Sequence, residues 1–167
     1  MISGPVHLLE FAFMGDLRAL MRRFPSGVAV VTVDANGDRL GLTVGTLVSL
    51  SLEPPLVGIS IAREAALHEL LREAGGFGLS LLAAGQEAVA QHFARGVPPI
   101  AHWHGIEMRD GVRGTPLIEG ALGWLECGVW AEWPVGDHTF FAGEVLECEL
   151  GTPQPPLLYL DGRYRPQ

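Results

Sequence analysis

The chain has 167 residues, of which 48% are hydrophobic and 18% charged, and its formal net charge at pH 7 is −8. A disordered chain is excluded, because such chains combine low hydrophobicity with high charge, and the length fits one domain. Nucleic-acid binding is not expected, because the chain is acidic and its basic residues, all of them arginine, form no cluster.

Neither export nor membrane insertion is expected. The first fifteen residues lack the basic region and the long apolar run of a signal peptide. No apolar run reaches the roughly 18 residues that span a bilayer. Two cysteines, Cys127 and Cys148, are too few for a disulfide scaffold. We therefore expect a cytoplasmic protein whose two thiols are free and buried.

The first predicted elements are a helix and a β-hairpin. Asp16 is a favourable N-cap, and apolar residues recur at helical spacing over residues 17–24, up to the next proline. A short β-branched strand over 28–33 is followed by an Asn-Gly pair, the strongest short hairpin signal. Residues 39–44 then form the returning strand.

The middle of the chain alternates strands with short helices. Residues 46–52 mix hydroxyl and apolar side chains, and residues 56–61 form an apolar strand that we expect to be buried on both faces. An amphipathic helix over 64–74, a strand over 77–82 and a second helix over 86–95 follow.

The C-terminal part is mostly β. Residues 96–120 are rich in Gly and Pro with little periodicity, and such long connections are usually functional or mobile. Residues 121–133 and 139–150 predict one long hairpin, and 157–160 a last short strand.

Many strands, two or three short helices and no strict βαβ repeat predict a mainly β fold, most simply a barrel. In one simple register of the long hairpin, Cys127 and Cys148 face each other across neighbouring strands.

Hydroxyl side chains gather between residues 41 and 51, at Thr43, Thr46, Ser49 and Ser51, among glycines and apolar residues. Hydroxyls and free backbone N–H groups suit an anion such as phosphate, and glycine lets the backbone approach a ligand. A strand with one polar face is the other interpretation, and spacing alone favours it. The segment is neither a Walker motif nor a dinucleotide glycine motif.

A second candidate anion site is the segment Ser60-Ile61-Ala62-Arg63, which ends a buried strand and leads into a helix. Helix N-termini attract anions, and the planar guanidinium of Arg63 matches phosphate oxygens. A solvated arginine without a partner is the alternative.

His102, Trp103 and His104 lie together in the long connection. Two histidines two residues apart share a side only in a strand, and no cysteine or carboxylate is in register with them. A loop that contacts substrate, cofactor or the other subunit is therefore favoured over a metal site. Trp103 either covers a ligand or plugs the core.

An ordered series of segments resembles the flavin reductase-like family, whose fold is the FMN-binding split barrel. The matching segments are 24–32, 41–44, 49–57, 77–82, 86–94, 120–127, 136–139, 155–159 and 162–164. The resemblance covers residues 16–165 and is greatest to the reductase components of two-component flavin-dependent monooxygenases. It implies a domain over 16–167, preceded by an N-terminal extension over 1–15.

The resemblance implies a homodimer of split β-barrels that holds FMN or FAD at the dimer interface. NADH or NADPH passes a hydride to the flavin, and a partner monooxygenase uses the reduced flavin. The residues implied in cofactor binding are Thr43, Val44, Gly45, Thr46, Ser49, Ser51, Ser60, Ile61, Ala62, Arg63, Phe93, His138 and Tyr164.

The resemblance places His138, the candidate catalytic residue, beside the flavin and the nicotinamide. The cofactors carry the chemistry of hydride transfer, so we interpret His138 as a positioning residue, with a plain turn histidine as the alternative. Phe93 is a core residue first and a ring contact second. Gly45 departs from the family's usual Asn or Ser, which leaves flavin affinity and flavin choice open.

Two other functions remain open from the sequence. One is an electron carrier that keeps FMN tightly bound and reacts with a protein partner. The other is a non-catalytic barrel that binds a different planar ligand, such as haem, or none.

Overall fold

The computed structural model describes residues 14–95 and 101–166. The N-terminal extension expected over residues 1–15 therefore lies almost wholly outside the described residues. In chain order the elements are α1 (Met14–Arg22), β1 (Ser26–Gly27), β2 (Ala29–Ala35), β3 (Asp38–Val44), β4 (Val48–Leu52), β5 (Pro55–Ala62), α2 (Ala66–Ala74), β6 (Gly76–Leu81), α3 (Glu87–Ala94), β7 (Met108–Asp110), β8 (Pro116–Ile118), β9 (Gly123–Val135), β10 (His138–Leu150), β11 (Leu157–Leu160) and β12 (Arg163–Pro166).

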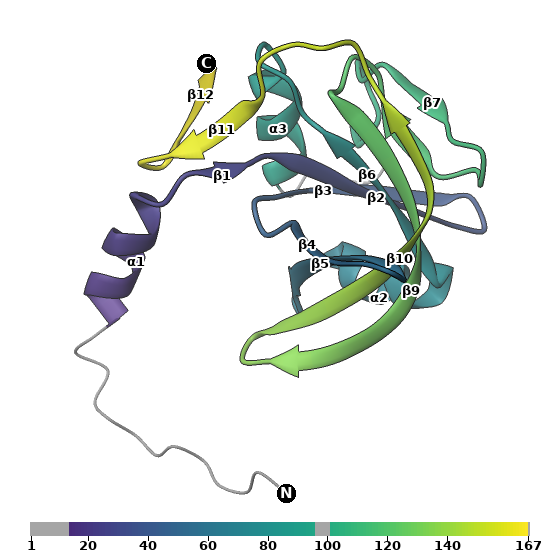
Figure 1. The fold of residues 1–167 in the computed structure, drawn as a ribbon, viewed down its shortest axis with the longest axis horizontal. Coiled ribbons are helices and arrows are strands. Elements are labelled where there is room, and N and C mark those ends of the chain that lie inside the picture. Colours follow the sequence, from purple (N-terminus) through teal and green to yellow (C-terminus); the bar gives the residue numbers. More distant parts are fainter. Residues whose placement is uncertain (1–13, 96–100, 167) are drawn as a thin grey trace, which may run out of the picture.

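One curled sheet dominates the molecule (Figure 1). Its seven strands follow the order β3-β2-β6-β9-β10-β5-β4, and every neighbouring pair is antiparallel. The two edge strands, β3 and β4, are joined only by residues 45–47, so the sheet must curl until its edges come close together. The result is a barrel that is open between β3 and β4, which confirms the mainly β fold with short helices and is consistent with a split barrel.

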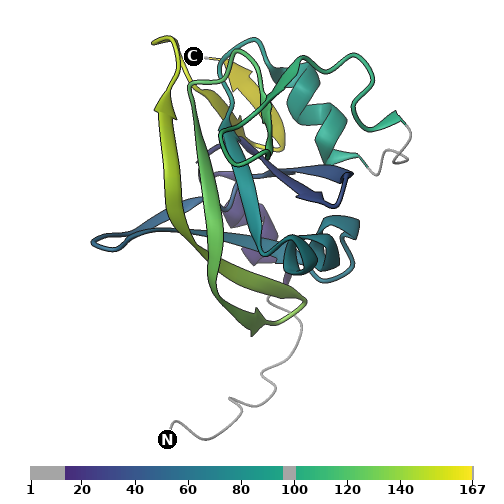
Figure 2. The ribbon, with the colours of Figure 1, turned by 90° about the vertical axis from the view of Figure 1, so that its right-hand side faces the viewer.

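The β2–β3 hairpin lies between helices α3 and α2 (Figures 1 and 2). Apolar residues of β2 serve both sides: Val31 and Val33 belong to the core cluster that includes Leu71 of α2, whereas Val30 belongs to the cluster with Phe93 of α3. Burial on both faces explains why Ala29, Val30 and Val31 are consecutive apolar residues and do not alternate with polar ones.

The predicted helices and long strands are confirmed, with shifts of a few residues at their ends. Helix α2 begins at Ala66 rather than at residue 64. Four short strands, β1, β7, β8 and β12, were not predicted. Each is only two to four residues long and, like every strand, depends on a partner strand that spacing alone does not identify.

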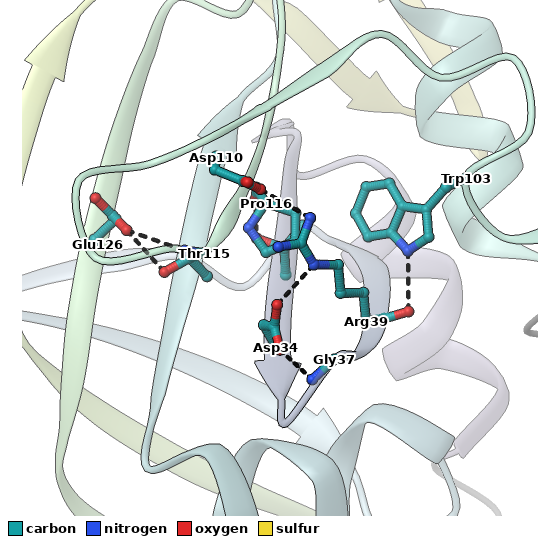
Figure 3. A network of polar contacts seen from close by, with 9 residues as sticks. Asp34, Gly37, Arg39, Trp103, Asp110, Thr115, Pro116 and Glu126 are labelled. Carbon is teal, nitrogen blue, oxygen red and sulfur yellow. Dashed lines mark hydrogen bonds and ion pairs between the residues drawn. The ribbon is translucent and has the colours of Figure 1, made fainter.

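The connection between α3 and β9 is built around a buried carboxylate (Figure 3). Glu126 is 2% exposed and accepts hydrogen bonds from the backbone N–H of Arg113 at 3.0 Å and from the N–H and hydroxyl of Thr115 at 3.3 and 2.8 Å. These contacts fix the turn between β7 and β8. The turn between β7 and β8, which appeared irregular in sequence, is thus held by a side chain of β9, and the β8 backbone is held in addition by Thr32 and Ser80.

Arg39 ties the β2–β3 turn to this region (Figure 3). It pairs with Asp34 at 2.6 Å and with Asp110 at 2.8 Å. Desolvation acts to raise the pKa of Asp34, but the hydrogen bonds from Gly37 N–H and Arg39 outweigh it and leave the pKa lowered.

The cysteine predictions need correction. Cys127 lies opposite Val145, and Cys148 lies opposite Leu125, so the thiols do not face each other. The turn pairs His138 with Val135, and the regular ladder that continues from this pair already places Cys148 opposite Leu125, so the register assumed for facing cysteines is not the one the turn sets. Cys127 is buried as expected, but Cys148 is exposed. Both thiols are free, as predicted.

Among the described helices, none has the length and apolar character needed to cross a bilayer.

Candidate functional site

A pocket of about 200 Å³ opens beside the ends of β1 and β3. We call it the hydroxyl pocket, because Ser26, Thr43 and two tyrosines contribute to its wall. Its lining residues are Ser26, Val28, Thr43, Val44, Gly45, Ala94, Tyr159 and Tyr164. The structure therefore brings together four of the residues predicted for cofactor binding, from segments as far apart as β3 and β12.

Close packing shapes the wall of the hydroxyl pocket. A Cβ on Gly45 would lie 2.7 Å from the hydroxyl oxygen of Ser26, so the absence of a side chain lets β3 end against that hydroxyl. The hydroxyl of Thr43 donates to the carbonyl of Ala90 in α3 at 2.7 Å. Ser26 was missed as a site residue, although it lies in one of the matching segments.

Tyr159 and Tyr164 face each other across β11 and β12, with ring centroids 5.3 Å apart. Burial, and secondarily the neighbouring Tyr159, raises the pKa of Tyr164. At neutral pH the Tyr164 phenol therefore keeps its proton and is a hydrogen-bond donor. Tyr159 is not among the residues predicted for cofactor binding, and the pairing of β11 with β12 is what brings it to the pocket.

Thr46 connects the hydroxyl pocket to the second predicted segment. Its hydroxyl accepts from the backbone N–H of Ser60 at 3.1 Å and lies 3.3 Å from the carbonyl of the same residue. Gly45, in the pocket wall, is therefore one residue away from a direct contact with the strand that leads to Arg63.

Arg63 lies against the turn between β9 and β10. Its guanidinium donates to the carbonyl of Gly136 and to that of His138, the latter at 3.5 Å, and its backbone N–H donates to Asp137 O at 3.1 Å. These contacts use two of the five guanidinium N–H groups. No carboxylate among the described residues pairs with Arg63, so its charge is available to an anion.

His138 is oriented by its neighbour. Its Nδ1 lies 2.7 Å from Oδ1 of Asp137, and because a carboxylate can only accept, Nδ1 carries the hydrogen. The hydrogen bond from His138, reinforced by a backbone hydrogen bond and the nearby positive charge, lowers the pKa of Asp137. Nε2 is left for a ligand, and the His138 side chain is 41% exposed.

The remaining predicted residues lie outside the hydroxyl pocket. Ile61 is fully buried, and Phe93 is 1% exposed, packed where a Cβ on Gly41 would lie 2.7 Å from its ring. Ser51 accepts a hydrogen bond from Glu53 N–H at 3.2 Å within the turn after β4, and Ser49 is exposed on β4.

His102 and Trp103 pack against β3. Nε2 of His102 lies 2.7 Å from the backbone nitrogen of Gly41, and the Trp103 indole N–H donates to Arg39 O at 3.0 Å. The ring of Phe93 contacts both aromatic side chains. This arrangement corresponds to the core plug that was one of the two interpretations of Trp103. The described part of the chain has no group of three or more metal-binding side chains.

A family model described as "Flavin reductase like domain" matches residues 21–167. The chain belongs to the flavin reductase-like family. The family predicted from the sequence is thereby confirmed.

Relatives of the family are similar over nearly the whole chain. The reductase component of 4-hydroxyphenylacetate 3-monooxygenase from Thermus thermophilus is 43% identical over 145 residues, which cover 87% of this chain and 91% of the relative. An NADH-dependent FAD reductase from Streptomyces globisporus is 37% identical over 172 residues, covering 98% of this chain and 91% of the relative.

Solved structures of the family have the same fold. The NADH:FAD oxidoreductase of Streptomyces globisporus, determined in complex with NAD and FAD fragments, superimposes with a TM-score of 0.87 at 36% identity. The superposition covers 95% of each chain.

The residues on the open edge of this flavin reductase-like barrel fit a flavin nucleotide. The hydroxyl pocket offers neutral donors and an accessible backbone at Gly45. Arg63 offers further N–H groups and a positive charge that no carboxylate in residues 14–95 and 101–166 pairs with. The hydrogen bonds between Thr46 and Ser60 join the two parts. A ligand with a neutral planar end and a phosphate end matches this order of groups.

Proposed function

We propose that this protein is an NADH-dependent flavin reductase that supplies reduced flavin to a partner monooxygenase. Relatives that are 43% and 37% identical bear the names of a monooxygenase reductase component and an NADH-dependent FAD reductase. Of the nicotinamide cofactors, NADH is the one in the names of such relatives, and both FAD and FMN occur among their flavins.

The observation that carries the proposal is the continuity of the site. It runs from the hydroxyl pocket through Thr46 and Ser60 to Arg63 and the turn with His138. Neutral hydrogen-bonding groups lie at one end and a positive charge at the other, which is the polarity of a flavin nucleotide from ring to phosphate. The proposed cofactor-binding residues on this path are Thr43, Val44, Gly45, Thr46, Ser60, Ala62, Arg63, His138 and Tyr164.

Flavin, when bound, supplies the acceptor for the hydride that leaves the nicotinamide, so the protein needs no acid or base of its own for this transfer. The chain's residues bind and orient. The unused N–H groups of Arg63 hold phosphate oxygens. Nε2 of His138 would be free to contact a bound cofactor, and the carboxylate of Asp137 holds the His138 ring in position.

Mixing the protein with NADH and FMN or FAD without oxygen tests this function. We expect the flavin to bleach while the nicotinamide absorbance falls in equal amount, at rates that increase with protein concentration. No bleaching with either NADH or NADPH would overturn the proposal. Flavin that stays bound through purification and is not reduced by NADH would instead indicate the electron carrier, and absence of flavin binding the non-catalytic barrel.

We further propose that the working form is a homodimer. At about 200 Å³ the hydroxyl pocket is smaller than the roughly 300–1,000 Å³ typical of ligand pockets, so one chain does not enclose both cofactors. An apolar patch lies on the outer face of β4, β5, β10 and β9, formed by Leu50, Phe140 and Trp133. The Trp133 and Phe140 rings are 6.2 Å apart, and both Phe140 and Leu50 lie over Gly58. A second copy of the chain is the occupant that would cover this patch and close the site.

A further inference from the structure

His68 is a buried polar residue directly behind the proposed site. It lies on α2, is 2% exposed, and stands among apolar core residues such as Leu67 and Leu71. The ring of Phe141 meets it edge-on, with centroids 5.6 Å apart. A polar side chain in an apolar core costs free energy unless its hydrogen-bonding atoms are satisfied, so its partners are informative.

Both ring nitrogens of His68 have partners. Nδ1 lies 2.7 Å from Oε1 of Glu69, and Nε2 lies 2.8 Å from the hydroxyl oxygen of Thr139. The carboxylate can only accept, so Nδ1 carries the hydrogen, and in the neutral ring Nε2 accepts from the Thr139 hydroxyl. Glu69 thereby sets the tautomer of His68, and His68 sets the direction of the Thr139 hydroxyl.

Thr139 joins the two segments that contain Arg63 and His138. It is 2% exposed, follows His138 in β10 and pairs with Ile61 of β5, while His138 pairs with Ala62. The hydrogen bond to His68 therefore holds the first residues of β10 from the core side. Arg63 holds the carbonyls of the same turn from the solvent side.

Glu69, the partner of His68 Nδ1, is itself held by an arginine of the same helix. Arg72 of α2 donates to both carboxylate oxygens of Glu132 on β9, at 3.0 and 2.8 Å, and lies 3.3 Å from Oε1 of Glu69. A continuous chain of polar contacts thus runs from Thr139 on β10 through α2 to β9. It holds both strands of the hairpin close to the turn.

We propose that His68 is a positioning residue for the flavin phosphate. Through Thr139 it fixes the start of β10, and with it the carbonyls of residues 136 and 138 that orient the Arg63 guanidinium. The inference rests on the proposed function, in which Arg63 binds the phosphate. Because His68 acts through Arg63, its loss should weaken the binding of flavins that carry a phosphate and leave the binding of flavins without one unchanged.

Thr139→Val tests the inference, since it keeps the shape of the side chain and removes the hydroxyl. We expect the KM and the dissociation constant for FMN to rise about three- to tenfold, the size expected for one buried hydrogen bond. The values for riboflavin, which has the same ring and no phosphate, stay unchanged. Thr139→Ser, which keeps the hydroxyl, is the matched control and binds both flavins like the unaltered protein.

Arg63→Ala gives the reference for losing the phosphate contact. We expect it to weaken FMN selectively, and Thr139→Val added to Arg63→Ala to cause little further loss. If Thr139→Val does not fold, His68→Leu is used in its place. We expect it to show the same FMN-selective defect. Equal weakening of FMN and riboflavin, or no weakening of either, overturns the positioning role. An unaltered protein that reduces no flavin contradicts the proposed function itself, so the two failures are distinguishable.

Discussion

Cys127 and Cys148 differ in what surrounds their thiols. Cys127 is 4% exposed, and burial, with smaller contributions from Cys148 and Glu126, raises the pKa of its thiol to about 12. Only the thiolate is a good nucleophile, so Cys127 is unreactive near neutral pH. Cys148 is exposed on β10 and lacks this protection.

Thiol labelling follows from this difference. In the folded protein at about pH 8, an uncharged alkylating reagent should modify one thiol quickly, and in urea it should modify two. The adducts are counted by mass spectrometry. Cys148→Ser is the control and should leave no fast adduct in the folded protein, whereas two fast adducts in the folded, unaltered protein would contradict the assignment.

At single residues, the sequence was informative where side chains had chemical character of their own. Thr43, Gly45 and Tyr164 were predicted and do line one pocket. Ser26 was missed because its role depends on the close packing of its hydroxyl against Gly45, which the sequence does not show. Phe93 shows the reverse case, since it was predicted as a possible ring contact but its ring is buried in the core.

Among the elements, the β7–β8 hairpin depends most on a single distant residue. Its turn contributes three hydrogen-bond donors to Glu126, which lies on β9 and is 2% exposed. A Cβ on Gly111 would collide with the same carboxylate, so the loop backbone passes directly over it. β7 and β8 form a separate two-stranded sheet, and the Glu126 carboxylate holds its turn to the main sheet.

Glu126→Gln should therefore destabilise the protein. The amide nitrogen would face backbone N–H donors that need an acceptor, and a buried group left unsatisfied costs about 1–3 kcal/mol. Urea unfolding measures the change. Glu107→Gln, on an exposed residue of the same connection, is the control and should stay within about 0.5 kcal/mol of the unaltered protein. A Glu126→Gln variant as stable as the control would show that the carboxylate does not hold the loop.

Secondary-structure elements were predicted correctly where the segment itself carries a periodic pattern or a turn motif. The Asn-Gly hairpin of β2 and β3, both later helices and the long β9–β10 hairpin lie where they were expected. Residues 96–120 have no such signal, and the part of this connection that the structure describes is ordered by Glu126 and by Arg39, which are distant in sequence. A segment that is ordered by contacts with distant residues has no local sequence pattern from which its structure can be predicted.

The surface of the molecule carries several large exposed apolar side chains on strands β4 and β9. Leu50 is 44% and Trp133 50% exposed, and edge strand β4 carries further exposed apolar residues. Exposed edge strands invite pairing or association, and contiguous apolar patches mark interaction surfaces. Both features lie beside the open edge of the barrel, where the proposed site is.

Leu50→Asp tests whether a second copy covers the patch. We expect the molar mass in solution, measured by light scattering after size exclusion, to fall from that of two chains to that of one, with weaker flavin binding. A buried unpaired charge opposes association strongly. Val112→Asp is the control, because Val112 is 82% exposed but lies away from the patch, and this variant should remain dimeric. A single-chain mass for the unaltered protein would overturn the dimer.

The two register shifts of the β9–β10 hairpin compensate each other. Trp130 is the extra residue on β9 and Leu146 the extra residue on β10, so the pairing slips by one residue and then returns. Both strands have thirteen residues, and His138 stays opposite Val135 while Leu150 stays opposite Gly123. Insertions of equal size on the two strands thus leave the ends of the hairpin where a regular ladder would put them. The middle of the hairpin can vary in sequence and surface while the turn that meets Arg63 keeps its place.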